Sequence, residues 1–204
     1  MAHKFEAARF ARLMSPERRR ELPPDEILRQ SGLTPGETLV DIGCGPGFLA
    51  LPAARIVGPK GRVIGLDVAS IMLTELRKNA RTAGLANIRT VRISEAAPVF
   101  PAGADVYLIV NTFHEFDDPA AHLAAVRRAM AARSRLVIVD FLKKKTHFGP
   151  PLSGRIPLSR ILPLLRSSGF DVARVFRASP DEYGVVARRR AENPPTTKIS
   201  KSTY

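Results

Sequence analysis

The stretch that decides the fold is 41–49, DIGCGPGFL, which puts a carboxylate, three glycines and a proline into one short bend. A β-branched and apolar run, Thr38–Ile42, precedes it, and Phe48–Val57 follows with the apolar spacing of a helix. The pattern predicts a buried strand that turns tightly into a helix. Because glycine lets a backbone bend sharply and approach a ligand closely, we expect a binding site at this bend.

Strands and helices continue to alternate after the bend. Further strands are predicted at Arg62–Asp67, Ile88–Ile93, Ala104–Val110 and Arg135–Phe141. The last two runs are almost continuously apolar, which is typical of strands in a parallel sheet that is covered on both faces. Segments with helical spacing separate the strands, for example Pro119–Met130.

The last third of the chain carries two strand-like segments, Phe170–Arg177 and Tyr183–Arg189, joined by the short connection ASPDE. Strands with so short a connection pair antiparallel. The sequence therefore predicts an α/β fold: a doubly wound, Rossmann-like sheet of seven mostly parallel strands, with a C-terminal antiparallel hairpin and helices on both faces. We expect a helical lead-in or lid at 1–32, the ligand-binding domain at 33–190 and a disordered tail at 191–204.

Composition narrows the class of protein. The 204 residues are 45% hydrophobic and 25% charged, and they contain no apolar run long enough to span a membrane and no secretory signal. The single cysteine, Cys44, fits a reducing compartment, so we expect a cytoplasmic protein. A net charge of +13 favours polyanions or acidic substrates, or it reflects a solvated surface with basic tails. Binding to nucleic acid thus stays open, and no pattern indicates the oligomeric state.

A dinucleotide is the first candidate ligand for the bend. Asp67 lies 67 − 47 = 20 positions after Gly47, as the acid of the dinucleotide fingerprint requires. Phe48, however, stands where the third glycine is needed, and Pro46 removes a backbone donor while Asp41 adds negative charge. A pyrophosphate is therefore disfavoured. An adenosine with a cationic end fits better, since a carboxylate attracts an ammonium or a sulfonium.

On these residues the sequence resembles the class I S-adenosylmethionine-dependent methyltransferases. Their first motif is similar to 40–48, VDIGCGPGF, and their second strand ends in an acid as 65–68, GLDV, does. The motif order continues from 33 to 189 and is most similar to small single-domain enzymes of quinone biosynthesis. The resemblance implies that S-adenosyl-L-methionine is the cofactor, with Asp67 accepting bonds from the ribose hydroxyls and Val68 against the adenine.

Other cofactor contacts follow from the same resemblance. The family often carries Asp-Ala after the third strand to hold the adenine amine, whereas this chain reads Ser94-Glu95-Ala96, so either Ser94 or Glu95 takes that place. The residues expected at the cofactor are Asp41, Gly43, Cys44, Gly45, Gly47, Asp67, Val68, Ser94, Glu95 and Asn111. The alternative is a glycine turn that serves only packing and an Asp67 that only caps a helix.

The segment after the fourth strand, 111–118 or NTFHEFDD, is where the family's reactive methyl faces its acceptor. His114 is the candidate catalytic base, because its ordinary pKa is near 6.5; the alternative is a packing histidine at a helix start. Glu115 and Asp117 are expected to cap the next helix, and Asp140 either lines the acceptor pocket or only ends its strand.

Motifs that are missing exclude several subclasses. The chain lacks the Asn/Asp-Pro-Pro-Tyr/Phe motif of amino-group methylases, and its one cysteine lies inside the bend. No metal is expected, since Asn111 is a poor ligand for a hard cation. The sequence therefore predicts a methyltransferase that acts on a small molecule. The alternatives are a methyltransferase acting on RNA or protein, and a non-catalytic S-adenosylmethionine-binding module.

Overall fold

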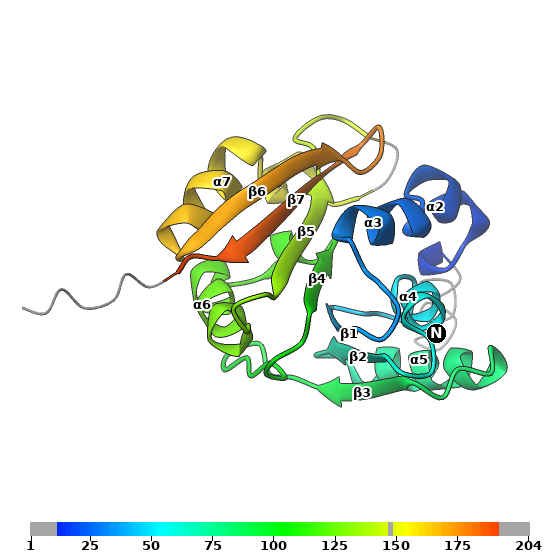
Figure 1. The fold of residues 1–204 in the computed structure, drawn as a ribbon. Coiled ribbons are helices and arrows are strands. Elements are labelled where there is room, and N and C mark those ends of the chain that lie inside the picture. The colour runs from blue at the N-terminus through cyan, green and yellow to red at the C-terminus, as the bar shows by residue number, and fades with distance from the viewer. Residues whose placement is uncertain (1–11, 147–148, 192–204) are drawn as a thin grey trace, which may run out of the picture.

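A computed structural model describes residues 12–146 and 149–191, and its seven strands form one sheet in the order β3-β2-β1-β4-β5-β7-β6 (Figure 1). The strands are β1 (Thr38–Ile42), β2 (Arg62–Asp67), β3 (Ile88–Arg92), β4 (Val106–Val110), β5 (Arg135–Phe141), β6 (Phe170–Arg177) and β7 (Glu182–Arg189). β1 to β5 are parallel, and β7 is antiparallel to both β5 and β6. The predicted fold class is confirmed. Residues 192–204 of the expected tail lie outside the described residues.

Helices cover both faces of the sheet (Figure 1). The helices are α2 (Pro16–Glu21), α3 (Pro24–Ser31), α4 (Ala50–Val57), α5 (Ser70–Thr82), α6 (Pro119–Ala129) and α7 (Leu158–Ser167), with short 3-10 turns η1 (Phe113–Glu115) and η2 (Leu152–Gly154). One buried cluster joins the sheet to α3, α4 and α5, and a second joins it to α6 and α7. Helices α3 to α7 thus each bury an apolar side against one face, whereas α2 has no buried residue.

Strand β4 has no charged residue because both of its faces are buried. In β4, Leu108 belongs to the cluster under α4 and α5, whereas its neighbours Tyr107 and Ile109 belong to the cluster under α6 and α7. Successive side chains of the strand therefore point to opposite faces of the sheet and pack into different core clusters. This explains why the run has no polar position. Two predicted elements begin two residues later than expected, α4 at Ala50 and β4 at Val106.

The terminal hairpin inserts β7 between β5 and β6. Phe141, at the carboxyl end of β5, pairs with Glu182, the first residue of β7. Because the two strands run in opposite directions, the start of β7 lies at the same edge of the sheet as the ends of the parallel strands. The hairpin thereby contributes Glu182 to the edge where ligands bind in such folds.

The N-terminal helices pack onto the same domain. Ser15 caps α2 by accepting a hydrogen bond from the Arg18 backbone N–H at 3.2 Å, and α3 buries Ile27 and Leu28 in the core cluster beneath α4. Arg135 of β5 donates to the carbonyl oxygens of Ser31 and Gly32, each at 2.6 Å, and so joins the end of α3 to the sheet. None of the helices in the described ranges is long and apolar enough to cross a membrane.

Candidate active site

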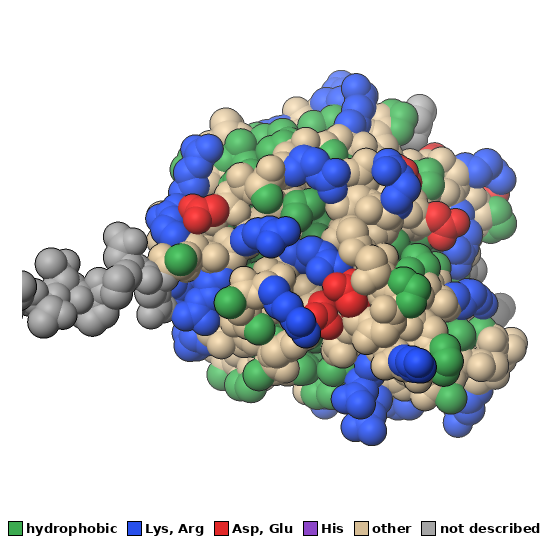
Figure 2. Space-filling model, in the orientation of Figure 1, with side chains coloured by type: hydrophobic (Ala, Val, Ile, Leu, Met, Phe, Trp, Pro, Cys, Tyr) green, Lys and Arg blue, Asp and Glu red, His purple; other side chains and the backbone are tan. Residues whose placement is uncertain are grey.

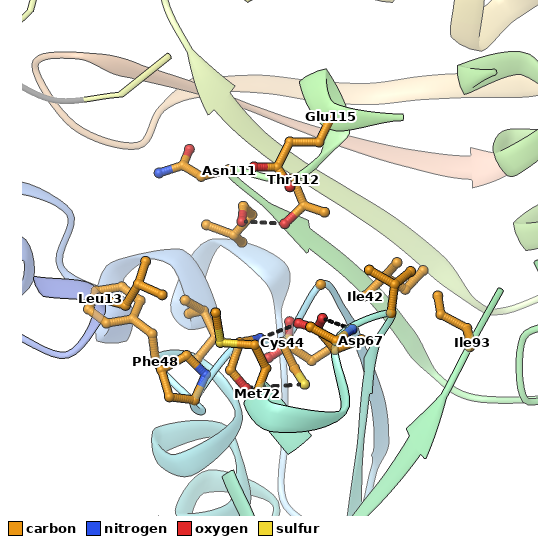
Figure 3. Close-up of a pocket in the computed structure, with 18 of the residues that line it drawn as sticks. Leu13, Ile42, Cys44, Phe48, Asp67, Met72, Ile93, Asn111, Thr112 and Glu115 are labelled. Atoms are coloured by element: carbon orange, nitrogen blue, oxygen red, sulfur yellow. Dashed lines mark hydrogen bonds between the residues drawn. The ribbon is translucent and has the colours of Figure 1, made fainter. Parts of the chain in front are cut away.

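Polar residues at the carboxyl ends of β1, β2 and β4 surround a cavity of about 370 Å³, which we name the first cavity. Asp41, Asp67 and Asn111 line it, as the sequence predicts for strand ends that meet at one edge. Figure 3 shows Asn111, Thr112 and Glu115 on one side and Cys44, Asp67 and Met72 on the other. Of the predicted cofactor residues, those in the lining are Asp41, Gly43, Cys44, Gly45, Asp67, Val68, Glu95 and Asn111.

The glycine bend has no backbone donor to spare for a phosphate. The N–H groups of Gly43 and Cys44 both donate to the Leu66 carbonyl oxygen, at 2.8 and 2.9 Å, and that of Gly47 donates to the Cys44 carbonyl oxygen at 3.1 Å. The N–H of Gly45 donates to Asp67 Oδ2 at 3.0 Å, and position 46 is a proline. A phosphate site needs free N–H groups that point at the anion. Residues 43–47 therefore offer no free N–H group to a diphosphate in this conformation.

Two glycines of the bend are needed for close packing. Gly43 has φ 74°, and a Cβ there would lie 2.4 Å from the Thr112 side chain. Gly47 has φ 105°, and a Cβ there would lie 2.6 Å from Leu76 Cδ1 of α5. Of the predicted cofactor residues, Gly47 and Ser94 are not in the lining of the first cavity, whereas Glu95 is.

Asp41 is a buried carboxylate that faces the first cavity. It is only 3% exposed, and its Oδ2 atom has no hydrogen-bond partner among the described residues. Burial, reinforced by the negative charge of Asp67, raises the pKa of Asp41 to about 7, although Arg18 and a backbone hydrogen bond from Ala50 act in the opposite direction. An unpartnered buried carboxylate is costly, so this position favours a ligand that brings a positive charge.

Asp67 and Cys44 complete the floor of the first cavity. The two carboxylate oxygens of Asp67 accept the N–H groups of Gly45 and Ala69, at 3.0 and 2.9 Å. Each oxygen has a second lone pair, so the carboxylate can still accept two hydroxyl groups. Burial, followed by the charges of Asp41 and Asp67, raises the pKa of the Cys44 thiol, which therefore stays protonated and is no nucleophile.

A second cavity of about 430 Å³ opens beside the first. The two share Leu13, Arg18, Asn111 and Glu115, so they adjoin at the end of β4. The other residues of the second cavity are Arg12, Ser15, Glu17, Glu21, Leu22, His114, Phe141, Gly149, Pro150 and Glu182. One ligand can thus lie against the glycine bend while another lies against His114.

His114 in the second cavity is held by Asp140. Its Nδ1 lies 2.8 Å from Asp140 Oδ1, and its backbone N–H donates to Asp140 Oδ2 at 3.0 Å. Burial alone disfavours the charged imidazole, but the hydrogen bond and the charge of Asp140, with a contribution from Glu115, outweigh it and raise the pKa of His114; Arg155 opposes them. The carboxylate keeps the proton on Nδ1 and leaves Nε2 as the basic nitrogen. Asp140 therefore does more than end its strand.

Other residues of the segment after β4 differ from expectation. Helix α6 is capped by Asp118, which accepts the Ala121 N–H at 2.9 Å, and not by Glu115 or Asp117. Within the described ranges, Asn111 is the one residue other than glycine with positive φ, 52°, and its Nδ2 donates to Glu182 Oε1 at 3.4 Å. Such strained positions cluster at functional sites.

Among the cavity residues that sequence reasoning missed, three make the contacts described above or line both cavities: Arg18, Thr112 and Glu182. Arg18 and Glu182 come from α2 and β7, far from the motifs along the chain, and no local pattern marks them. Thr112 directly follows Asn111 and packs over Gly43, so its position after β4 was the available signal. No group of three or more His, Cys, Asp or Glu side chains in the described ranges could hold a metal ion.

The fold and the two adjoining cavities define an α/β domain with room for two neighbouring ligands at the carboxyl edge of its sheet. A family model described as a methyltransferase domain matches residues 33–152, more than half of the chain. The chain belongs to this methyltransferase-domain family.

Known relatives agree with the family. The chain is 38% identical to nocamycin O-methyltransferase of Saccharothrix syringae over 104 residues, which are 50% of this chain and 37% of the relative. It is 31% identical to the ubiquinone/menaquinone biosynthesis C-methyltransferase UbiE of Vibrio vulnificus (strain YJ016) over 115 residues, 55% of this chain and 44% of the relative. The chain thus spans less than half the length of either relative.

A solved structure matches almost end to end. The crystal structure of a SAM-dependent methyltransferase from Aquifex aeolicus superposes with a TM-score of 0.83 at 28% identity, and the match covers 88% of this chain and 96% of that one. The architecture described above is therefore that of a methyltransferase domain.

Proposed function

We propose that the chain transfers a methyl group from S-adenosyl-L-methionine to a small-molecule acceptor. One observation carries the proposal: the glycine bend has committed its N–H groups internally and presents the carboxylates of Asp41 and Asp67 to the first cavity. Such a site rejects a diphosphate and favours a ligand with hydroxyls and positive charge. The residues fit this cofactor, since Asp41 Oδ2 lacks a partner and Asp67 retains acceptor capacity.

Four residues of the first cavity make the main polar and adenine contacts of the proposed complex. Asp67 accepts the ribose hydroxyls, Asp41 accepts the ammonium group, and Val68 packs against the adenine. Glu95 accepts the adenine amine. His122 of α6 lies beside it, with its Nε2 3.5 Å from Glu95 Oε1 and its ring stacked on that of Phe116 at 4.0 Å.

The remaining expected contacts line the path of the methionine chain. The methionine part of the cofactor would cross the bend formed by Gly43, Cys44 and Gly45. Asn111 lies on the opposite side of the first cavity from Cys44 (Figure 3). When bound, the cofactor supplies an activated methyl group on a sulfonium with a good leaving group, so most of the catalysis comes from positioning and exclusion of water.

The second cavity supports a small acceptor that loses a proton. His114, with Asp140 behind it, is suited to remove a proton from a hydroxyl group or an acidic carbon through Nε2. Phe141 and Pro150 add apolar wall. The relatives' names include both an O-methyltransferase and a C-methyltransferase, and both reactions fit such a base. A cavity of about 430 Å³ suits a metabolite better than a macromolecule.

Charge motivates a second candidate, methyl transfer to RNA or protein. The net charge of +13 would favour a polyanion. On the face shown in Figure 2, however, Lys and Arg are dispersed, with Asp and Glu between them, and form no single basic patch. A small acceptor is therefore the first choice. The lid role of residues 1–32, the boundary near 33 and a cytoplasmic location stay predictions.

Calorimetry followed by a labelling screen tests the proposal. The purified chain should bind S-adenosylmethionine and S-adenosylhomocysteine but not NAD. A methyl-labelled cofactor should then mark a small molecule in a metabolite fraction, and His114→Ala should abolish the labelling while cofactor binding persists. Binding of NAD alone would overturn the cofactor assignment. Label in RNA would instead favour the second candidate, and binding without any labelling would indicate a non-catalytic module.

A further inference from the structure

Arg18 is a cation of α2 that faces both cavities. Its guanidinium lies 4.2 Å from the centroid of the Phe48 ring, and its Nη1 donates to the Leu13 carbonyl oxygen at 3.0 Å. In the described part of the chain, this is the one hydrogen bond recorded for its side chain, although a guanidinium carries five N–H groups. The side chain is thus fixed by stacking, with donors left for a ligand.

Arg18 and Asp41 present opposite charges to the first cavity without pairing with each other. No ion pair joins them within the described ranges, and Asp41 Oδ2 has no hydrogen-bond partner there. Burial lowers the pKa of Arg18 to about 10, with Glu182 and Asp41 opposing, so the group is desolvated yet still charged at neutral pH. A buried guanidinium and a buried carboxyl group that do not pair with each other match a ligand that carries a carboxylate and an ammonium together.

We infer that Arg18 binds the α-carboxylate of the cofactor's amino-acid end while Asp41 binds its ammonium group. The inference rests on the proposed function, and it makes α2 part of the cofactor site. An anion could also come from the acceptor, since Arg18 lines the second cavity too. The test therefore compares two ligands that differ only in the amino-acid end.

The probes are S-adenosylhomocysteine and 5′-methylthioadenosine, which has the same adenosine thioether but no amino-acid end. Arg18→Gln should weaken S-adenosylhomocysteine binding about 10- to 100-fold, as expected for loss of a charge-assisted hydrogen bond, and should change methylthioadenosine binding less than twofold. Arg18→Lys should recover part of the affinity. The matched control is Arg19→Gln: Arg19 lies on the same helix, 5.5 Å from the Phe48 ring centroid, but lines neither cavity.

Each outcome separates the inference from the proposed function. If Arg18→Gln weakens both ligands equally, the side chain acts through packing and the inference is wrong. An unchanged affinity for both ligands also overturns it. If the unmodified chain binds neither ligand, the proposed function itself fails. Circular dichroism and a melting curve for each variant confirm that the comparison is made on folded protein.

Discussion

Replacement of Asp67 by asparagine should weaken cofactor binding while the fold is retained. Asp67 accepts the N–H groups of Gly45 and Ala69 and, in the proposed complex, two ribose hydroxyls. The asparagine amide has nearly the same shape but keeps only one acceptor oxygen. One backbone N–H or one hydroxyl group must then face another donor. The change therefore removes acceptor capacity and charge without opening a cavity.

The expected magnitude follows from the number of bonds. A hydrogen bond to a charged group contributes about 1.5–3 kcal/mol, so loss of one such bond to the ribose weakens binding about 10- to 140-fold. A backbone N–H left without a partner costs about 1–3 kcal/mol where it is buried. At roughly 2–4 °C per kcal/mol for a chain of this size, the ligand-free melting temperature falls by a few degrees. Relief of the repulsion between Asp67 and Asp41 offsets part of that loss.

Calorimetric titration with S-adenosylhomocysteine and a thermal melt measure the two effects. Asp105→Asn is the matched control, because Asp105 Oδ2 accepts the Thr38 N–H at 2.9 Å at the opposite end of β1. The control should lose stability but keep its affinity for the ligand. If Asp67→Asn binds S-adenosylhomocysteine within twofold of the unmodified chain, Asp67 does not hold the ribose, and the assignment of the first cavity is wrong.

Three further outcomes are expected. Folding raises the pKa of Asp41 from 3.8 to about 7, so the unfolding free energy of the ligand-free chain should fall by up to about 4 kcal/mol as the pH rises from about 4 to 7. Denaturant titrations at several pH values should show that Asp41→Asn removes this slope. Gly47→Ala should destabilise the fold by about 1–3 kcal/mol, because Gly47 has φ 105° and an added Cβ would touch α5. The loss should exceed that of Gly84→Ala, where an added Cβ would meet no atom within 4 Å, and equal melting temperatures for the two variants would contradict the packing argument. Asp140→Asn should lower the pKa of His114, because burial then acts without the opposing carboxylate, and imidazole NMR titration would refute this if the pKa stayed raised.

The sheet and the glycine bend were predictable because their signals are local. The apolar run before Gly43 and the acid that ends β2 lie within one βαβ unit, and each strand reports its own burial through its composition. The bounds of β1 and β2 match the prediction residue for residue. The choice against a diphosphate was also local, since Pro46 and Asp41 can be read from the bend itself.

The pairs that give the site its chemistry were not predictable in the same way. His114 and Asp140 were each noted as candidates, but only the pairing of β4 with β5 brings Nδ1 within 2.8 Å of the carboxylate. Glu182 lies at the carboxyl edge of the sheet because β7 pairs with β5. A hairpin pattern in the sequence does not predict that pairing. Ser94 and Glu95 are likewise adjacent in the sequence, and only the folded chain shows that Glu95 lines the first cavity whereas Ser94 is not in its lining.

The range matched by the family model contains nearly all residues of the first cavity but only a minority of those of the second. Apart from Leu13 and Arg18, every residue of the first cavity lies within the matched range 33–152. The second cavity takes most of its lining from segments outside that range, namely 12–22 and Glu182. The family model can therefore indicate a shared cofactor while leaving the acceptor open, because most of the residues that line the proposed acceptor cavity lie outside the matched range. Exchange of residues 12–22 with those of a relative should consequently alter acceptor choice more than affinity for 5′-methylthioadenosine, whose adenosine contacts all lie in the matched range.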